Sequence, residues 1–430
     1  MEENHRIALK KVALVTGACG FMGSRMVERL KENKGYLVLA TDIIQTKPNL
    51  KCDQFFLADL TNISKSEELI RSIVKGFGRL EAIFDIKGLF DYAANRDELF
   101  KVNVAGTKNL YDAVYKFGFR PRIVVWGAAG GYPFPTTPGP AMTEKTTPNP
   151  QGNYLQSKYA QEIQALDFGK KTGLAVTVIR PGGVYGPGAR YGVGLTLILA
   201  GRGMMGPIAP DTGDNRGSTV HVDDVCGAAL FLAEQPAEKV AGQIYNVADD
   251  SSYTLDAITR FIGQEVGFTF LPFPISSLKM VKRMNQRLVE KAKKIGRVSL
   301  LHPEMSNLLK YDSLLSTAKL QTLGWKPEFP DAKEGLRQTI AWYRQNGWIE
   351  SKEFQEQRAF LTIAAMIGFS IFMEILILCY AFLPTAFNVW THLLALAGVG
   401  TLIALSWLGY RLVFVISGFN NPDLWTRRKT

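Results

Sequence analysis

Two side chains in the middle of the chain, Tyr154 and Lys158, have the types and the spacing of an acid–base pair. They lie four residues apart in a segment, 153–171, that is predicted to be helical, so both side chains fall on one helix face. An ammonium group beside a phenol stabilises the phenolate and lowers the pKa of the phenol. Tyr154 could then remove a proton from a substrate hydroxyl, or return one to a carbonyl. Because the same spacing also occurs by chance in ordinary helices, the pair is informative only beside a cofactor site.

A glycine-rich turn near the N-terminus predicts such a site. An apolar strand over 12–15 is followed by Gly17, Gly20 and Gly23. The first glycine permits a tight turn, the second lets the backbone approach a diphosphate, and the third lets a helix pack against the strand. The N-terminus of that helix would face the anion. A glycine triad alone is a weak signal, and an ordinary strand–turn–helix is the alternative.

A carboxylate at the end of the next predicted strand indicates which dinucleotide binds. The strand over 36–42 ends in Asp42. A carboxylate in this place hydrogen-bonds the hydroxyls of an adenosine ribose and repels the 2′-phosphate of NADP. The next residues are Ile43 and Ile44, so no arginine follows to reverse that preference. The sequence therefore predicts NAD, with NADP less favoured, and the alternative is an aspartate that merely opens a turn.

Strands and helices alternate regularly through the first half of the chain. Further strands are predicted over 54–58, 80–86, 122–126 and 174–180, and a helix is predicted to open at Asn103. This alternation is typical of a doubly wound parallel sheet. The predicted fold class is α/β, with a Rossmann-type sheet followed by a smaller C-terminal substrate-binding part.

Several motifs follow one another in a fixed order. They are TGACGFMG at 16–23, Asp59-Leu60, NVAGT at 103–107, YLQSK at 154–158, RPGGVYGPG at 180–188, HVDD at 221–224 and YNVADD at 245–250. With them, residues 10–345 resemble the extended short-chain dehydrogenase/reductase family, which contains NAD-dependent nucleotide-sugar epimerases and dehydratases and the 3β-hydroxysteroid dehydrogenases. The resemblance is specific for the superfamily and much less so for the substrate.

The resemblance assigns roles to individual residues and bounds to the domains. It implies that Tyr154, Lys158 and Asn103 are catalytic, that Lys158 also holds the nicotinamide ribose, and that no metal is bound. The implied cofactor-binding residues are Gly17, Gly20, Phe21, Met22, Gly23, Asp42, Ile43, Asp59, Leu60, Lys158 and Pro181. The catalytic domain is expected over 1–350, with an NAD-binding core at about 10–187 and 218–250 and a substrate-binding part at about 188–217 and 251–345.

Two positions depart from the family pattern. Relatives carry a serine or threonine about 25 residues before the tyrosine, but Gly127–Gly130, which includes Ala128, has no hydroxyl. Loss of such a donor is expected to cost roughly 10²–10³ in rate, unless Thr136, Thr137, the substrate or a water replaces it. In the second departure Lys87 replaces a small residue, and it could reach a phosphate, the substrate or solvent.

Three other polar residues have competing interpretations. Asn103 suits a helix N-cap as well as the catalytic role. His221, inside an apolar run, is predicted to be a packed structural residue rather than a base. Arg216 lies one residue from the place where nucleotide-sugar enzymes hold a diphosphate. Apolar segments around it suit a greasy ligand better, and an ordinary core explains them almost as well.

Composition limits the partners. The chain has 430 residues, a net charge of +11 and four cysteines without metal-ligand spacing. No nucleic-acid motif accounts for the charge. A basic amphipathic helix over 278–297 is instead a candidate for lying on an anionic membrane, with a solvated lid helix as the alternative. A homodimer is left open.

The C-terminal part predicts a membrane anchor. Residues 359–382 and 390–416 are apolar runs long enough to cross a bilayer as a two-helix transmembrane hairpin. Basic residues flank the pair and are absent between the runs, so the positive-inside rule places the catalytic domain and the basic tail, 417–430, in the cytoplasm. The expected membrane is the endoplasmic reticulum in a eukaryote and the inner or plasma membrane in a prokaryote; a soluble buried hairpin is the alternative.

These expectations favour a membrane-anchored, NAD-dependent oxidoreductase of the 3β-hydroxysteroid dehydrogenase-like branch. It would oxidise, or reversibly reduce, a secondary alcohol on a sterol-like or isoprenoid substrate. One alternative is a nucleotide-sugar epimerase or dehydratase at a membrane. The other, suggested by the missing hydroxyl, is a non-catalytic NAD-binding protein.

Overall fold

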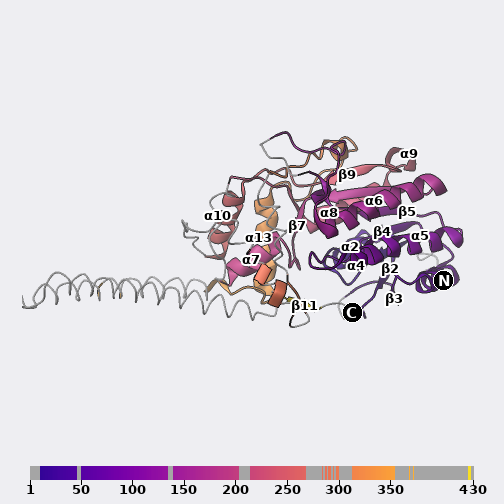
Figure 1. The fold of residues 1–430 in the computed structure, drawn as a ribbon, viewed down its shortest axis with the longest axis horizontal. Helices are drawn as coiled ribbons and strands as arrows, with labels where there is room; N and C mark the ends of the chain where they lie inside the picture. Colours follow the sequence, from indigo (N-terminus) through magenta and orange to yellow (C-terminus); the bar gives the residue numbers. More distant parts are fainter. Residues whose placement is uncertain are drawn as a thin grey trace, which may run out of the picture.

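A parallel β-sheet forms the centre of the protein. The computed structural model describes residues 10–45, 50–133, 139–202, 214–267 and 312–353, with isolated positions between 283 and 299, at 368 and 371, and at 425–427. Within them, a seven-stranded sheet runs in the order β3-β2-β1-β4-β5-β6-β9, with every neighbouring pair parallel (Figure 1). Its strands are β1 (Lys11–Thr16), β2 (Tyr36–Asp42), β3 (Gln54–Leu57), β4 (Ala82–Asp85), β5 (Arg122–Trp126), β6 (Val176–Pro181) and β9 (Ile244–Val247). The predicted doubly wound sheet is confirmed.

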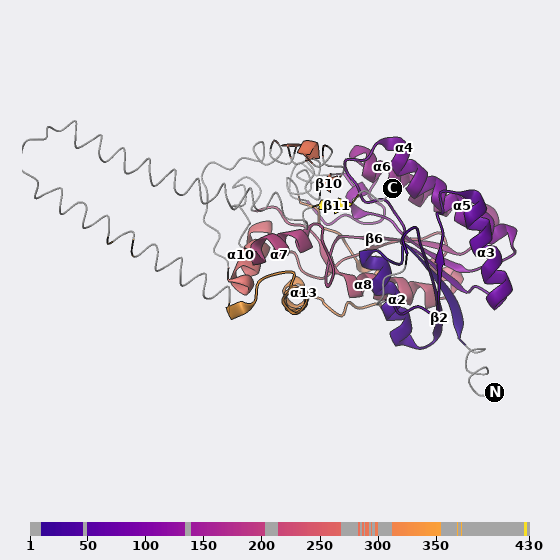
Figure 2. The same ribbon diagram turned by 90° about the horizontal axis from the view of Figure 1, so that it is seen from below.

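Helices cover both faces of this sheet (Figure 2). On one face the apolar sides of α2 and α8 meet the sheet, and on the other the apolar sides of α3, α5 and α6 do so. The central strands are consequently buried on both sides, which is why β1 and β2 read as nearly continuous apolar runs. These helices are α2 (Phe21–Asn33), α3 (Ile63–Phe77), α5 (Gly106–Lys116), α6 (Gly152–Thr172) and α8 (Val222–Glu234).

The strand order reverses beside β1. From β1 the chain proceeds to β2 and β3 on one side, and then returns to place β4 on the other side. In open α/β sheets, ligands bind where the order reverses, outside the carboxyl ends of the strands. This edge carries the glycine turn after β1, Asp42 at the end of β2 and Trp126 at the end of β5.

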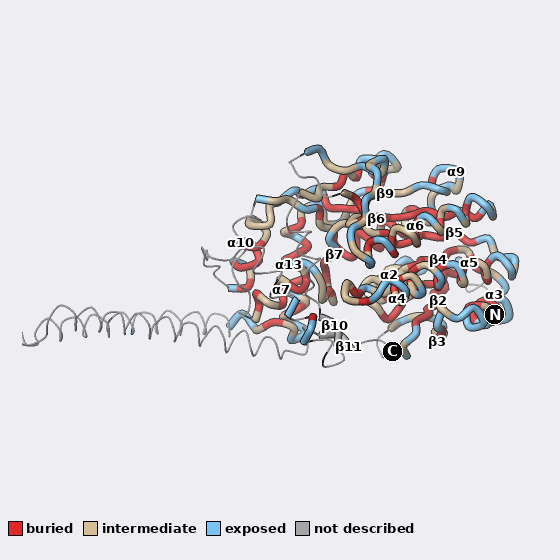
Figure 3. The backbone as a smooth tube through the Cα atoms, viewed as in Figure 1, coloured by how far each residue is buried: buried red, intermediate tan, exposed pale blue. Residues whose placement is uncertain are grey.

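A smaller second part stands beside this edge of the sheet (Figures 1 and 3). Its buried side chains, which include Tyr185, Phe261 and Ile340, come from β7 (Gly183–Tyr185), α7 (Val193–Gly201), α10 (Leu255–Val266) and α13 (Ala332–Gln345). β7 pairs in parallel with β8 (Thr219–His221). The remaining elements are α4 (Arg96–Phe100), α9 (Ala237–Val240), α12 (Ala318–Gln321), β10 (Arg297–Ser299), which pairs with β11 (Trp425–Arg427), a π-helical turn at Lys101–Ala105 and a 3-10 turn at Ala129–Gly131.

The predicted membrane elements fall almost wholly outside the described residues. This holds for the runs 359–382 and 390–416 and for most of the basic segment 278–297. Among the residues that are described, no helix is both long and apolar enough to cross a bilayer.

Candidate functional site

A cavity of about 620 Å³ opens at the carboxyl ends of the strands, between the sheet and the smaller part. Residues of β2, β5, β6 and α6, and of the loops that follow β1 and β4, line its wall. Tyr154 lines it. So do all of the predicted cofactor-binding residues, which are Gly17, Gly20, Phe21, Met22, Gly23, Asp42, Ile43, Asp59, Leu60, Lys158 and Pro181. The sequence-predicted residues are thus brought together, except for Asn103, which lies just outside the wall.

The glycine turn between β1 and α2 has no room for side chains. Gly17 has φ +63°, and a Cβ there would lie 2.9 Å from the Cα of Lys87; a Cβ at Gly23 would overlap the carbonyl oxygen of Gly17. Gly20 precedes the first turn of α2, and no side chain caps that helix N-terminus. Its free N–H groups and the helix dipole therefore face the cavity, an arrangement that suits a diphosphate.

Asp42 is fixed beside this turn. Its carboxylate accepts hydrogen bonds from the backbone N–H of Cys19 (2.9 Å) and from that of Ile43 (2.8 Å), which joins the end of β2 to the glycine turn. Its side chain is largely buried, yet the residue lines the cavity. A carboxylate held in this way, close to a helix N-terminus, fits the ribose hydroxyls of a dinucleotide.

Tyr154 and Lys158 share one face of α6, as predicted. Lys158 is 6% exposed, and its ammonium donates to Oε1 of Gln161 at 2.5 Å. Burial lowers the pKa of Lys158 to about 8, although the charge of Asp85 opposes that shift. Burial raises the pKa of Tyr154, and the neighbouring Tyr92 and Tyr191 add to the rise. In the chain by itself the pKa of Tyr154 is thus raised, with burial as the largest cause.

Asn103 does not begin a helix. Helix α4 starts at Arg96, and Asn95 is its cap, since its side chain accepts from the N–H of Glu98. Asn103 lies in the π-helical turn that follows α4, so both the predicted helix start and the N-cap interpretation are wrong.

The buried amide of Asn103 instead joins two segments. Its Oδ1 accepts from the N–H of Leu89 (2.7 Å), and its Nδ2 donates to the hydroxyl of Ser157 (2.9 Å). Asn103 thereby ties the loop after β4 to α6, one residue before Lys158, and so positions the catalytic helix against the cavity.

Comparison with known proteins identifies the family. A model of the NAD dependent epimerase/dehydratase family matches residues 13–248. This chain belongs to that family. A putative UDP-glucose 4-epimerase of Methanocaldococcus jannaschii is 25% identical over 340 residues, which cover 77% of this chain and 98% of that protein. The decarboxylating sterol-4-alpha-carboxylate 3-dehydrogenase of Candida albicans is 22% identical over 367 residues, covering 77% and 97%.

Solved structures agree on the fold. The UDP-glucose 4-epimerase of Thermotoga maritima has a TM-score of 0.61 at 23% identity and covers 78% of this chain and 99% of its own. The resemblance to extended short-chain dehydrogenases and the prediction of NAD as cofactor are confirmed by the family. One of the two sequence relatives is named for a nucleotide sugar and the other for a sterol, so membership alone does not select a substrate.

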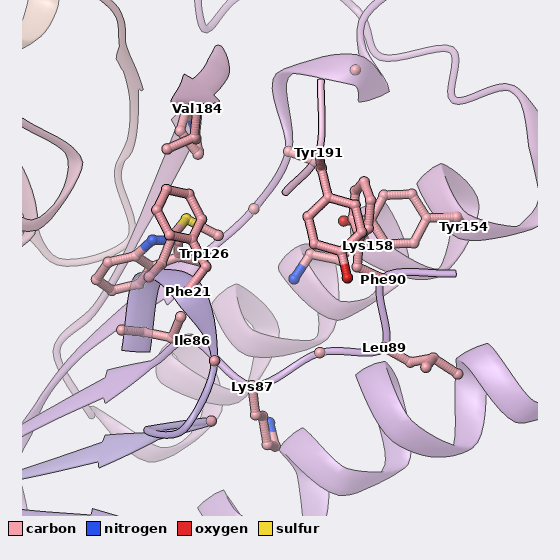
Figure 4. A pocket seen from close by; sticks show the side chains of 18 of the residues that line it. Phe21, Ile86, Lys87, Leu89, Phe90, Trp126, Tyr154, Lys158, Val184 and Tyr191 are labelled. Carbon is pink, nitrogen blue, oxygen red and sulfur yellow. The ribbon is translucent and has the colours of Figure 1, made fainter. Parts of the chain in front are cut away.

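In this family member the side chain of Lys87 does not point to solvent, since it is only 10% exposed and protein groups hold its ammonium. Its ammonium donates to the buried carboxylate of Asp85 (2.9 Å) and to the hydroxyl of Thr107 (2.7 Å). Figure 4 shows its side chain directed away from the aromatic side chains of the cavity. Burial by itself would raise the pKa of Asp85, but Lys87 and the hydroxyls of Thr16 and Tyr111 hold it below its ordinary value.

No side chain with a hydroxyl group stands where the family carries its serine or threonine. Gly127, Ala128, Ala129 and Gly130 all line the cavity. At Gly127 a Cβ would come within 3.0 Å of a carboxylate oxygen of Glu162, so the strand end passes too close to α6 for a side chain there. The proposed substitutes Thr136 and Thr137 lie outside the described residues.

His221 and Arg216 are occupied elsewhere. His221 is fully buried outside the cavity wall and caps α8, where its Nδ1 accepts from the N–H of Asp223 at 3.3 Å. Burial lowers the pKa of His221 to about 4, so it is neutral and packed, as predicted. Arg216 pairs with Asp312 at 3.0 Å and does not reach the cavity wall.

Sequence reasoning missed an aromatic cluster at the catalytic end of the cavity. The ring of Phe90 lies 5.0 Å from that of Tyr154 and 4.5 Å from that of Tyr191, and Tyr92 lies 4.9 Å from Tyr154 (Figure 4). These residues come from the loop after β4, from α6 and from the loop before α7. No motif in the sequence marks the two loops, so only the fold reveals that they meet.

Proposed function

We propose that this protein is an NAD-dependent oxidoreductase that oxidises, or in reverse forms, a secondary alcohol on an apolar, lipid-like substrate such as a 3β-hydroxysteroid. The observation that carries the proposal is the character of the wall around Tyr154. It includes many apolar and aromatic residues, among them Leu89, Phe90, Tyr92 and Val193. Such a wall favours a ligand whose reactive hydroxyl stands on a large apolar body.

The charges of the wall also disfavour a nucleotide sugar. A diphosphate in a protein is normally met by arginine or lysine. Among the described residues of the wall the cations are Lys87 and Lys158, which are engaged by Asp85 and Gln161. Arg216, the expected diphosphate ligand, is paired with Asp312.

In this proposal the side chains divide the proton chemistry between them. Bound NAD supplies the hydride acceptor. Tyr154 takes the proton of the substrate hydroxyl, or returns it in the reverse direction, at its phenol oxygen. Lys158, when charged, stabilises the phenolate and is placed to hold the nicotinamide ribose. Asn103 acts indirectly, because it fixes α6 against the loop after β4.

The proposal includes membrane attachment through 359–382 and 390–416, with the catalytic domain in the cytoplasm. It is supported by the apolar length of both runs and by the basic residues that flank them. An anchor beside the site would bring the cavity to a substrate that partitions into the bilayer. The full chain should remain with membranes after an alkaline wash, and its release into the supernatant would contradict this part.

The decisive experiment measures NADH formation by the full chain in detergent with a 3β-hydroxysteroid. In parallel, product analysis measures conversion of UDP-glucose to another UDP-sugar, because an epimerase reoxidises its NADH and forms no net NADH. We expect turnover of the steroid, and a loss of roughly 10²–10⁴ in Tyr154→Phe with NAD binding retained. The matched control is Tyr115→Phe, which removes a phenol oxygen from a side chain that is 43% exposed and remote from the cavity.

Other outcomes select the alternatives. Conversion of UDP-glucose alone would favour the nucleotide-sugar epimerase. NAD binding without turnover of either substrate would favour the non-catalytic protein.

A further inference from the structure

The proposed reaction needs a hydrogen-bond donor that the end of β5 does not supply. A donor aimed at the reacting oxygen stabilises the charge that develops there, and removal of one typically costs 10²–10³ in rate. Ala128 stands where the family pattern has a hydroxyl, and its methyl group cannot donate. A working enzyme of this chemistry must therefore obtain the donor from another segment of the cavity wall.

Tyr191 is the candidate, because it brings a hydroxyl to the cavity wall near Tyr154. It follows β7, lines the cavity, and its ring contacts Phe90 at 4.5 Å, which in turn contacts Tyr154. Figure 4 shows the rings of Tyr154 and Tyr191 on the two sides of Phe90, close to Lys158. The two phenols are near enough for the charge of Tyr191 to raise the pKa of Tyr154. Within the described part of the chain, the hydroxyl of Tyr191 makes no hydrogen bond.

The backbone that carries Tyr191 is fixed on both sides. The carbonyl of Ala189 accepts from the hydroxyl of Tyr343 at 2.5 Å, and Arg190 stacks on the ring of Trp348 at 4.5 Å. The carbonyl of Tyr191 itself accepts from the N–H groups of Gly194 (3.0 Å) and Leu195 (3.4 Å) at the start of α7. A side chain on such a support is preorganised, so little reorganisation is needed when a substrate oxygen arrives.

We propose that Tyr191 is a catalytic residue whose hydroxyl donates a hydrogen bond to the substrate oxygen on which Tyr154 acts. It would replace the donor that is missing at Ala128. The inference rests on the proposed oxidoreductase function and adds to it a residue from the substrate-binding part.

The chemistry balances without further groups. The proton of the substrate hydroxyl passes to Tyr154, which acts in its phenolate form, the hydride from the same carbon passes to NAD, and the carbon–oxygen bond becomes a carbonyl. Tyr191 keeps its own proton throughout. Burial raises the pKa of Tyr191, so its hydroxyl stays protonated and can donate at neutral pH.

The test removes the hydroxyl donor at Tyr191 and then restores a hydroxyl at position 128. Tyr191→Phe keeps the ring and its contact with Phe90 but removes the hydroxyl, and we expect kcat for a 3β-hydroxysteroid to fall roughly 10²–10³-fold with NAD affinity unchanged. The double variant Ala128→Ser/Tyr191→Phe has a hydroxyl where the family carries its serine or threonine. We expect its kcat to be at least about tenfold higher than that of Tyr191→Phe, which is a partial recovery. Tyr115→Phe, remote from the cavity, is the control.

Each result has a distinct meaning. Unchanged kcat in Tyr191→Phe would overturn the proposal, and so would a loss confined to KM, because that would show an ordinary contact with bound substrate. Rescue of Tyr92→Phe by Ala128→Ser in place of Tyr191→Phe would assign the donor to Tyr92 and also overturn it. Failure of the proposed function is separate, since Tyr154→Phe would then turn over the steroid as fast as the unaltered chain, or no variant would use it.

Discussion

The two ends of the cavity are built on different principles. At the cofactor end the site is formed mainly by backbone atoms. Gly17, Gly20 and Gly23 leave space for a diphosphate, and backbone N–H groups hold the carboxylate of Asp42 in place. At the catalytic end, side chains from three separate segments meet around Tyr154 and Tyr191. The first end keeps the three glycines and the acid of the family pattern, whereas the second departs from it at Ala128. The other departure, Lys87, has its backbone against Gly17 at the cofactor end.

This difference shows which part of the site is free to change. A glycine turn tolerates almost no substitution, because a Cβ would strike backbone atoms that cannot move aside. A hydrogen-bond donor, by contrast, can be supplied by any segment that reaches the same oxygen. A chain can therefore lose its hydroxyl at the end of β5 without losing the chemistry, provided that a neighbouring loop supplies another.

The largest effect is expected from a substitution in the glycine turn, which should weaken NAD binding. In Gly17→Val a branched side chain must adopt φ near +63° with its Cβ 2.9 Å from the backbone of Lys87. The left-handed conformation alone costs roughly 1–2 kcal/mol, and the displaced turn loses its hydrogen bonds to the diphosphate, at about 1.5–3 kcal/mol each. We expect the dissociation constant for NAD to rise at least about a hundredfold, measured by titration of the purified chain.

Gly76, a glycine without steric constraint, provides the control for this prediction. Gly76, in the exposed last turn of α3, has no atom within 4 Å of its Cβ position. Gly76→Ala should leave NAD binding unchanged and raise stability by about 0.5–1 kcal/mol, since alanine is favoured in helices. NAD binding in Gly17→Val equal to that in Gly76→Ala would show that the turn does not hold the cofactor.

The cofactor end could be predicted from sequence because its determinants are local. The strand, the three glycines and the acid at the end of β2 lie within one continuous stretch, and the positive φ at Gly17 is a requirement that glycine alone satisfies easily. The alternation of strands and helices fixed the class of sheet for the same reason. Asn103 was misplaced because its N-cap propensity is also local, whereas its partners Leu89 and Ser157 are distant in sequence.

An intermediate effect is expected at Lys158, which links the two ends. Its pKa of about 8 means that it is charged below that pH and neutral above it. In Lys158→Met the phenol of Tyr154 loses the stabilising charge, so kcat/KM should fall roughly 10–100-fold below pH 8. The deficit should narrow as pH rises through 8, because the unaltered enzyme then loses the same charge. The measurement is kcat/KM against pH for both proteins.

Lys158→Arg supplies the control, because a guanidinium keeps its charge through this range. The ratio of kcat/KM of the unaltered enzyme to that of Lys158→Arg should therefore also fall as pH rises above 8, because only the unaltered enzyme loses its charge there. A constant ratio between Lys158→Met and the unaltered enzyme across that pH would show that Lys158 acts through hydrogen bonds alone.

The catalytic end could be predicted only in part. The Tyr154–Lys158 spacing is local and was recognisable, but the aromatic cluster depends on how the loop after β4 and the loop before α7 approach α6. Lys87 illustrates the same limit. Asp85 is two residues away, but the sequence does not reveal that Thr107 also holds the ammonium of Lys87, because Thr107 arrives from α5 through tertiary packing.

The smallest effect on catalysis is expected at Lys87, although its effect on stability is large. Lys87→Met leaves the fully buried carboxylate of Asp85 without its ion pair, and removal of one member of a buried pair typically costs about 3–5 kcal/mol. Since Lys87 does not reach the aromatic wall, kcat/KM should change less than about threefold, in line with the modest effect of a contact outside the reacting centre. Chemical denaturation and steady-state kinetics measure the two quantities.

The pH dependence and a double variant separate this explanation from a role at the substrate. Asp85 has a lowered pKa in the folded protein, so it contributes stability above its unfolded pKa of about 3.9, and this contribution is lost as pH falls through the folded value. Without Lys87 the pKa of Asp85 rises, so the deficit of Lys87→Met should be greatest near neutral pH and shrink in acid. Asp85→Asn/Lys87→Met should recover much of the loss, because no unpaired charge remains. A large fall in kcat/KM with unchanged stability would instead place Lys87 among the groups that meet the substrate, and the catalytic end would then extend across β4.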